Sequence, residues 1–158
     1  MAMWQFRAWI VPARASSSTG AELAKAIREG TIDAWAGEEP GWCAKRVENL
    51  GLAPTESWDR HTAMWGSQEG HYVQETTAGT RVLEAETAID ARVVDLAYCR
   101  RLAQFVSDLN AKLVTADGLV VEGTEAEIIQ AVQGSDVWRF IVDPESFLLT
   151  RSKSSDAE

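Results

Sequence analysis

The segment from Arg81 to Gly123 constrains the fold more than any other, because three hydrophobic patterns follow one another there. Residues 81–92 alternate between apolar and polar side chains, the period of a strand with one buried face. Residues 94–109 repeat apolar side chains at steps of three and four, which predicts an amphipathic helix. Residues 112–123 contain Asp117-Gly118 between apolar runs, a strong hairpin signal, and we expect a type I′ turn with positive φ at both residues. This strand, helix and hairpin are expected to form the centre of the fold.

Period-two patterns elsewhere predict further strands. Residues 3–11 alternate, and residues 58–78 contain two alternating runs separated by glycine-containing turns. Together with residues 81–92, these two runs predict an antiparallel meander. In the simplest register, Trp65 lies opposite His71, and His61 lies near Glu75. The apolar run 137–142 is short enough to be helix or strand, and its β-branched and aromatic content favours a strand.

Helix signals flank these strands. Thr19 and Thr124 are each followed three residues later by a glutamate, the capping-box pattern that opens a helix. Pro40 could open a helix that ends near Asn49, and Pro144 could open a single turn. The sequence therefore predicts an α+β fold, with a mainly antiparallel sheet of five to seven strands (meander plus hairpin) covered by three or four helices. We expect one domain over residues 1–150 and a disordered tail over residues 151–158.

Composition narrows the class of function. The formal charge of −9 and pI of about 4.7 disfavour nucleic-acid binding, which needs clustered Lys and Arg. Such a charge serves solubility, or it attracts a basic partner, whereas mimicry of nucleic acid is disfavoured because the acidic residues are dispersed. No apolar run approaches the roughly 20 residues of a membrane span, and the N-terminus lacks the basic start of a signal peptide. Since Cys43 and Cys99 form no disulfide framework, we expect a cytoplasmic protein with reduced cysteines.

Known catalytic and ligand-binding motifs are missing from the sequence. It contains neither a glycine-rich phosphate loop nor a nucleophile elbow, and its cysteines and histidines lack metal-ligand spacing. We therefore expect no cofactor, no metal and no assigned catalytic residue. Two weaker patterns remain. His61 near Glu75 could be an acid–base pair, although a surface ion pair is the commoner outcome. Glu84, Glu86 and Asp90 share a strand face, which resembles the paired carboxylates of some hydrolases or an ordinary solvated face.

The favoured candidate site is an exposed aromatic patch with an acidic rim on the meander. Seven tryptophans in 158 residues is a high number; they could build the core, or some could line a binding surface. Side chains of compatible parity would form the patch, whose composition is typical of protein-binding surfaces. The predicted binding residues are Trp58, Met64, Tyr72, Gln74, Glu84 and Glu86.

These patterns favour a small acidic protein-binding module without catalytic activity. Its concrete form is an immunity or antitoxin-like protein that neutralises a basic partner. One alternative is a small hydrolase that uses a carboxylate or His–carboxylate site on the meander. Another is a structural or regulatory subunit that forms a homodimer through the meander edge.

Overall fold

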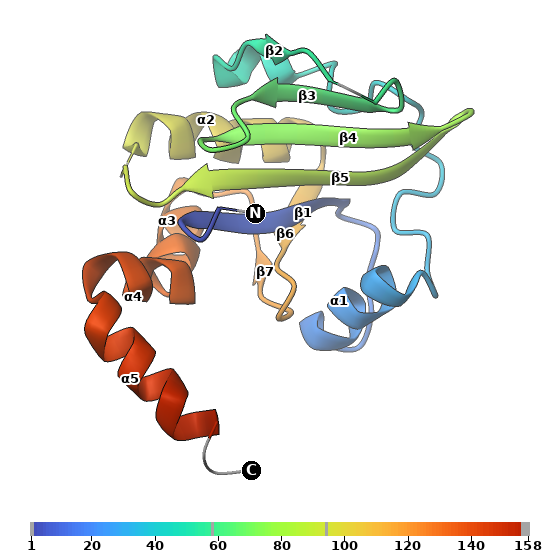
Figure 1. The fold of residues 1–158 in the computed structure, drawn as a ribbon. Helices are drawn as coiled ribbons and strands as arrows, with labels where there is room; N and C mark the ends of the chain where they lie inside the picture. The colour runs from blue at the N-terminus through green and yellow to red at the C-terminus, as the bar shows by residue number, and fades with distance from the viewer. Residues whose placement is uncertain (1, 58, 94, 156–158) are drawn as a thin grey trace.

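The computed structural model describes residues 2–57, 59–93 and 95–155, and its centre is one seven-stranded sheet (Figure 1). Every pair of neighbouring strands is antiparallel, in the order β2-β3-β4-β5-β1-β6-β7. The strands are β1 (Gln5–Pro12), β2 (Pro54–Thr55), β3 (Thr62–Gly66), β4 (Tyr72–Ala78), β5 (Arg81–Asp90), β6 (Ala111–Val114) and β7 (Val120–Val121). The predicted α+β fold, with its meander and hairpin, is confirmed.

Five α-helices and a short 3-10 helix complete the described part of the chain, one α-helix more than the upper expectation. They are α1 (Gly20–Glu29), η1 (Val47–Leu50), α2 (Leu96–Asp108), α3 (Glu125–Gln133), α4 (Asp136–Val142) and α5 (Pro144–Ser155). Both predicted N-caps are confirmed, since the Thr19 and Thr124 hydroxyls accept hydrogen bonds from the backbone N–H three residues on, at 3.1 and 3.3 Å. The reciprocal half of each capping box is not formed, because the Glu22 carboxylate pairs with the Ser18 hydroxyl and the Glu127 carboxylate accepts from the Glu122 N–H. None of the helices in the described residues is long and apolar enough to cross a bilayer.

The core lies between the sheet and α2, which is behind the meander in Figure 1. Phe6, Ala8 and Ile10 of β1 are buried in one cluster with Leu102 and Phe105 of α2. Two of the tryptophans, Trp35 and Trp42, belong to this cluster, and Trp9, Trp65 and Trp138 pack against it while partly exposed. The core interpretation of the tryptophans therefore holds for these five.

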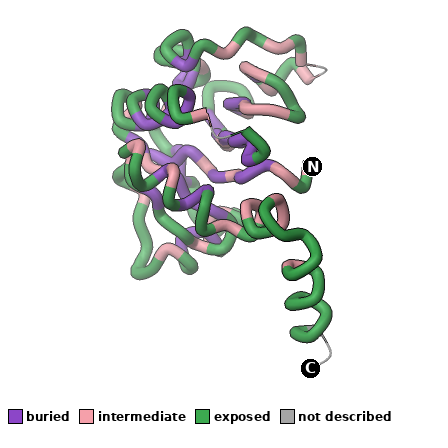
Figure 2. Tube along the Cα trace, turned by 90° about the vertical axis from the view of Figure 1, so that its left-hand side faces the viewer, coloured by how far each residue is buried: buried purple, intermediate pink, exposed green. Residues whose placement is uncertain are grey.

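The opposite face of β3, β4 and β5 carries no helix in the described structure (Figure 1). α1 lies by the other end of the sheet, where Arg28 donates to the Ala116 carbonyl in the β6–β7 hairpin at 2.6 Å. The last helix, α5, leaves the body of the protein and is exposed along most of its length (Figure 2). It contacts α4 through an edge-to-face pair of Phe140 and Phe147, whose ring centroids are 5.9 Å apart.

The register of the meander differs from the predicted one by two residues. Trp65 pairs with Val73 rather than lying opposite His71, and Ala63 pairs with Glu75. The reason is the turn that joins β3 to β4, which the Ser67 N–H closes by donating to the His71 carbonyl, so that the turn is centred on Glu69, one residue later than predicted. A shift of two residues keeps every side chain on its predicted face, because the side-chain period of a strand is two.

A β-bulge changes the faces at the other end of the meander. The pairing of β4 with β5 slips between Thr76 and Thr77. As a result Val82 is buried, with 1% of its surface exposed, and Leu83 is 43% exposed. The alternation of residues 81–92 predicts that Leu83 faces the core, and this prediction is wrong, since a bulge adds one residue and reverses the alternation beyond it.

Three local predictions are also wrong. Residues 137–142 form helix α4 instead of a strand, because the Ser135 hydroxyl caps it by accepting from the Trp138 N–H at 3.3 Å. Residues 41–50 form turns and η1 instead of a regular α-helix. The β6–β7 hairpin is present, yet positive φ occurs at Gly118 (93°) and not at Asp117, so its turn is not type I′.

The C-terminal helix is longer than the single turn expected after Pro144. It continues through Ser155, into the segment for which the sequence predicts a disordered tail. Residues 156–158 lie outside the described residues. The proposed division into a domain and a tail remains a prediction.

Candidate binding groove on the open sheet face

Five of the six predicted binding residues share the open face of the sheet. The register places Met64 beside Gln74 and Gln74 beside Glu86, while Glu84 lies beside Thr76. Tyr72 pairs with Ala88 on the same face. Trp58, the sixth residue, lies outside the described residues. The alternation of the meander strands was therefore sufficient to gather these side chains.

The aromatic centre of this face is not exposed, and that prediction is wrong. Tyr72 and Met64 are 2% and 6% exposed, and with Ala88 they form a small buried cluster separate from the main core. The Arg7 guanidinium lies over the Tyr72 ring, 5.7 Å from its centroid, and the Tyr72 hydroxyl donates to Glu86 Oε1 at 2.9 Å. Long polar side chains, rather than a helix, thus cover the apolar residues.

These residues form the floor of a groove. Its main hollow has a volume of about 540 Å³ and is lined by Trp4, Arg7, Gln68 and Glu69 together with predicted site residues. A second hollow of about 410 Å³, which contains Glu84, shares Arg7 and Glu86 with the first. Because the two hollows share lining residues, they form one groove across β3, β4, β5 and β1. We call it the open-face groove.

The carboxylates of the groove differ in their surroundings. Burial raises the pKa of Glu84 above its usual value, the neighbouring Glu86 carboxylate raises it further, and the Trp9 side chain offsets part of the rise. The pKa of Tyr72 is raised well above its usual value by burial and by Glu86, partly offset by Arg7. At neutral pH the Tyr72 hydroxyl is therefore a hydrogen-bond donor, and it orients Glu86.

The loop between β3 and β4 forms one wall, and hydrogen bonds hold it in place. The Gln5 amide donates to the carbonyls of Gln68 and Gly70 at 2.8 and 2.7 Å. The Trp4 indole donates to the Glu69 carbonyl at 2.9 Å, and the Arg92 guanidinium stacks over Trp4 at 4.1 Å. The wall is therefore formed before any ligand arrives, which lowers the entropy lost on binding.

Sequence reasoning missed Arg7, Trp4, Gln68 and Glu69. The alternation in the first strand does indicate that the Arg7 side chain lies on the face opposite that of its buried neighbours. Its place beside Tyr72 depends on the pairing of β1 with β5, in which Arg7 lies opposite Ala88. That pairing joins residues about 80 positions apart, and no local pattern in the chain encodes it.

The predicted acid–base pair of His61 and Glu75 is wrong. Glu75 is buried on the covered face, where its carboxylate accepts hydrogen bonds from the backbone N–H groups of Gly41 and Cys43 at 2.6 and 2.7 Å. His61 is exposed, and its carbonyl accepts from Thr77. Glu75 therefore organises the irregular 41–43 segment, which no sequence pattern predicted.

Asp90 is also absent from the groove lining. It forms an ion pair with Arg92 at 2.8 Å, and hydrogen bonds from Arg92 hold the pKa of Asp90 below its usual range. Of the three carboxylates that the strand alternation predicts on one face, only Glu84 and Glu86 therefore line the groove. The Asp90 N–H donates to His71 Nδ1 at 3.0 Å, so that ring nitrogen is unprotonated.

His71 lies behind the groove wall rather than in the groove. Its ring stacks on Tyr98 of α2 with a centroid distance of 4.2 Å, and its Nε2 is 4.0 Å from Asp95. Burial lowers the pKa of His71, although Asp95 and Asp90 partly oppose the change. The neutral ring thus links the loop, the end of β5 and the start of α2.

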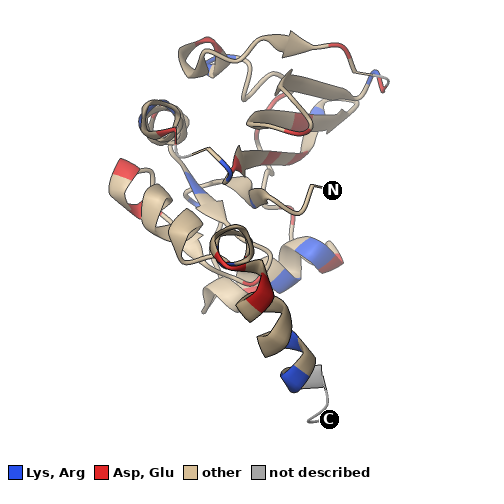
Figure 3. Ribbon diagram, turned by 60° about the vertical axis from the view of Figure 1, so that its left-hand side comes forward, with Lys and Arg blue, Asp and Glu red and all other residues tan. Residues whose placement is uncertain are grey.

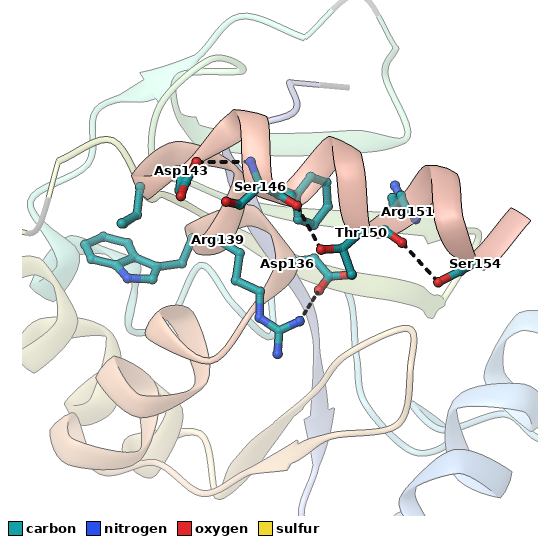
Figure 4. A pocket seen from close by; sticks show the side chains of 10 residues that line it. Asp136, Arg139, Asp143, Ser146, Thr150, Arg151 and Ser154 are labelled. Carbon is teal, nitrogen blue, oxygen red and sulfur yellow. Dashed lines mark hydrogen bonds and ion pairs between the residues drawn. The ribbon is translucent and has the colours of Figure 1, made fainter.

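A hollow outside the open-face groove, of about 530 Å³, lies between α4 and α5 (Figure 4). Its visible interactions are local to this helix pair, for example the ion pair between Arg139 and Asp136 at 3.5 Å and the bond from Thr150 to the Ser146 carbonyl at 2.8 Å. None of the predicted site residues lines it. It is an open notch between two consecutive helices.

Charge is distributed unevenly over the fold. Acidic residues are spread over strands and helices, and basic residues gather on α1 and near the end of α5 (Figure 3). Among the described residues, no three His, Cys, Asp or Glu side chains are placed to hold a metal ion.

No known protein family matches the sequence, and neither characterised proteins nor solved structures include a significant match.

Proposed function

We propose that this is a non-catalytic binding protein whose open-face groove receives a basic segment of a protein partner. The observation that carries the proposal is the groove itself, which places Glu84 and Glu86 above a preorganised, buried floor. A net charge of −9 would steer a cationic partner toward the protein and speed association. An immunity or antitoxin-like role, in which the groove neutralises a basic toxin, is the concrete form.

We also propose that the protein is located in the cytoplasm. Cys43 and Cys99 are both free and buried, and burial raises the pKa of each thiol above its usual value. Such thiols are unreactive, as expected of structural cysteines in a reducing compartment.

The proposal is tested by titrating the protein with an amidated hexalysine peptide by calorimetry at two salt concentrations. We expect binding that weakens as salt rises, since the attraction is screened. Glu84→Gln and Glu86→Gln should each weaken binding about three- to tenfold, the range of a partly exposed ion pair of roughly 1 kcal/mol. The matched control is Glu48→Gln, which makes the same change of charge at an exposed position of η1 outside the groove.

If Glu48→Gln weakens binding as much as the two groove variants, attraction is a property of net charge alone and the groove is not the site. If wild-type protein does not bind the peptide at low salt, the proposed function is wrong.

One observation favours a hydrolase as the second candidate. The raised pKa of Glu84 beside Glu86 gives two neighbouring carboxylates in different environments, as general acid–base catalysis requires. A panel of chromogenic ester and glycoside substrates tests this candidate. Turnover that disappears in both Glu84→Gln and Glu86→Gln would support it, and absence of turnover by wild-type protein across the panel would exclude those substrate classes.

A further inference from the structure

Helix α5 is a regular helix of 12 residues, and none of its described side chains is buried. It packs on α4 through the pair of Phe140 and Phe147, whereas Leu148 and Leu149 have 56% and 61% of their surface exposed. A helix of this length is marginally stable in water when it stands alone, so its stability depends on packing against other elements. Much of α5 is nevertheless uncovered and can pack against another molecule (Figure 2).

The side of α5 that faces the hollow beside α4 carries a regular row of side chains. They recur at steps of three and four, which places them on one face of the helix. The row consists of Asp143, Ser146, Phe147, Thr150, Arg151 and Ser154. Trp138 and Val142 of α4 line the same hollow, and Val142 is 64% exposed. We call this hollow the α4–α5 notch; its centre is apolar and open to solvent.

The row carries opposite charges at two positions. Asp143 directly precedes the first turn, and Arg151 follows eight residues later, about 12 Å along the helix axis (Figure 4). Neither forms an ion pair with any of the described residues. The Asp143 carboxylate accepts a hydrogen bond from the Ser146 N–H at 3.1 Å, and the Arg151 guanidinium lies over the Phe147 ring at 5.5 Å. Both charges can therefore still pair with charges of another molecule.

These charges are arranged so that the row is complementary to itself. Phe147 is midway between Asp143 and Arg151 in the sequence, four residues from each. When two copies of the row lie antiparallel about a two-fold axis at Phe147, each Asp143 meets Arg151 of the other copy. The remaining charged residues of the notch, Asp136 and Arg139, already pair with each other at 3.5 Å, so they add no unmatched charge.

From this symmetry we infer that the α4–α5 notch is a dimer interface, in which α5 of a second copy of this chain packs antiparallel to α5. Two ion pairs between Asp143 and Arg151 orient the helices, and the Phe147 rings meet at the centre. A purely basic or acidic segment fits this place less well, because the four charges of the notch sum to zero. The inference does not depend on the proposed function, since no residue lines both the notch and the open-face groove.

Sedimentation equilibrium of the full chain, from about 1 μM to about 1 mM, tests the interface. Wild-type protein should reach the mass of two chains at the upper concentrations and dissociate on dilution. Arg151→Glu should weaken the dimer about tenfold or more, because two attractions become two repulsions. The matched control is Lys153→Glu, which makes the same change of charge at an exposed position of α5 outside the notch lining and should change the dimer much less.

A second variant tests whether Asp143 and Arg151 meet. Asp143→Asn removes the charge and preserves the helix cap, since asparagine caps as well as aspartate. In the wild-type background it should weaken the dimer about threefold, and in the Arg151→Glu background it should strengthen the dimer, because a repulsion is then removed. The net charge of −9 alone predicts a stronger dimer in both backgrounds.

Three results would each overturn the inference. Wild-type protein that stays monomeric over the whole range does not form this dimer, and the notch is then left to a different partner. Equal weakening by Arg151→Glu and Lys153→Glu would place any dimer contact outside the notch. If Asp143→Asn shifts the dimer in the same direction in both backgrounds, Asp143 and Arg151 do not meet. The titration with hexalysine tests the open-face groove separately, so the two proposals can fail independently.

Discussion

The two faces of the sheet are built from the same strands, yet they are buried in different ways. On the covered face, Phe6 and Ile10 of β1 pack with Phe105 and other apolar side chains of α2. On the open face, Tyr72 and Met64 are equally buried, but Arg7 and Glu86 of neighbouring strands cover them. One face is closed by another element of structure, and the other is closed by its own polar side chains.

The comparison separates stability from binding. A sheet face that is covered by a helix stays buried, because separating the helix from the sheet would expose a large apolar surface. A face closed by long side chains can exchange those contacts for a ligand at a lower free-energy cost. Substitutions on the covered face should therefore change unfolding most, and substitutions on the open face should change binding more than unfolding.

The largest effect is expected from Phe105→Ala. Phe105 is fully buried between α2 and the sheet, so the truncation should lower the free energy of unfolding by about 3–5 kcal/mol. Urea denaturation followed by tryptophan fluorescence measures the change. A loss below about 1 kcal/mol would mean that α2 does not hold the covered face closed, and the contrast between the faces would disappear.

Glu75→Ala should come next, at about 2–4 kcal/mol of lost stability. Its carboxylate accepts from two backbone N–H groups, and alanine would leave both without an acceptor in a buried place. Glu84→Ala is the control, since it removes a carboxylate of the same strand pair from the open face. Comparable losses in the two variants would break the distinction between a structural carboxylate and a binding one.

Tyr72→Phe sharpens the comparison on the open face. It removes the hydroxyl that donates to Glu86 and keeps the buried ring, so stability should fall by about 0.5–1.5 kcal/mol. Because Glu86 would lose its orientation, hexalysine binding should weaken in the same variant. Unchanged binding would show that Glu86 does not need the hydroxyl to be positioned.

The smallest effect is expected from the protonation of His71, which lies where the two faces meet at the groove wall. The pKa of His71 is lowered in the folded state, so the unfolded chain takes up the proton first as pH falls. This residue should therefore contribute full stability above pH 6.5, with part of it lost as pH falls from there to the folded-state pKa.

The measurement compares unfolding free energies of wild-type protein and His71→Asn across this pH range, with His61→Asn as control. The slope of wild-type protein should be larger than that of His71→Asn, and His61→Asn controls for the loss of one histidine at an exposed position. Equal slopes in all three proteins would show that the His71 ring does not couple folding to pH.

The sequence could predict which face of the meander most side chains occupy, but not which other segments of the chain surround them. Alternation placed Tyr72, Gln74 and Glu86 together even though the predicted register was off by two residues, because parity survives an even shift. The bulge after Thr76 inserts one residue, an odd change, and Leu83 was therefore assigned to the wrong face.

What the sequence could not supply depends on contacts between distant segments. The pairing of β1 with β5 brings Arg7 to Tyr72, and the Glu75 carboxylate meets the backbone of residues 41–43. Neither contact has a local signature. The helix at residues 136–142 does have a local signature, which is the Ser135 N-cap. The β propensity of its six apolar-rich residues nevertheless favours a strand, and the prediction followed that propensity.

The ends of the sheet bear on how the protein behaves in a crowded solution. Its outermost strands, Pro54–Thr55 and Val120–Val121, are two residues long, and a proline has no N–H to offer an incoming chain. A strand from another molecule would find too short a ladder to extend, so polymerisation by edge-to-edge pairing is disfavoured at both ends. The protein can thus keep one broad face open to a partner with little risk of growing into fibres along its edges.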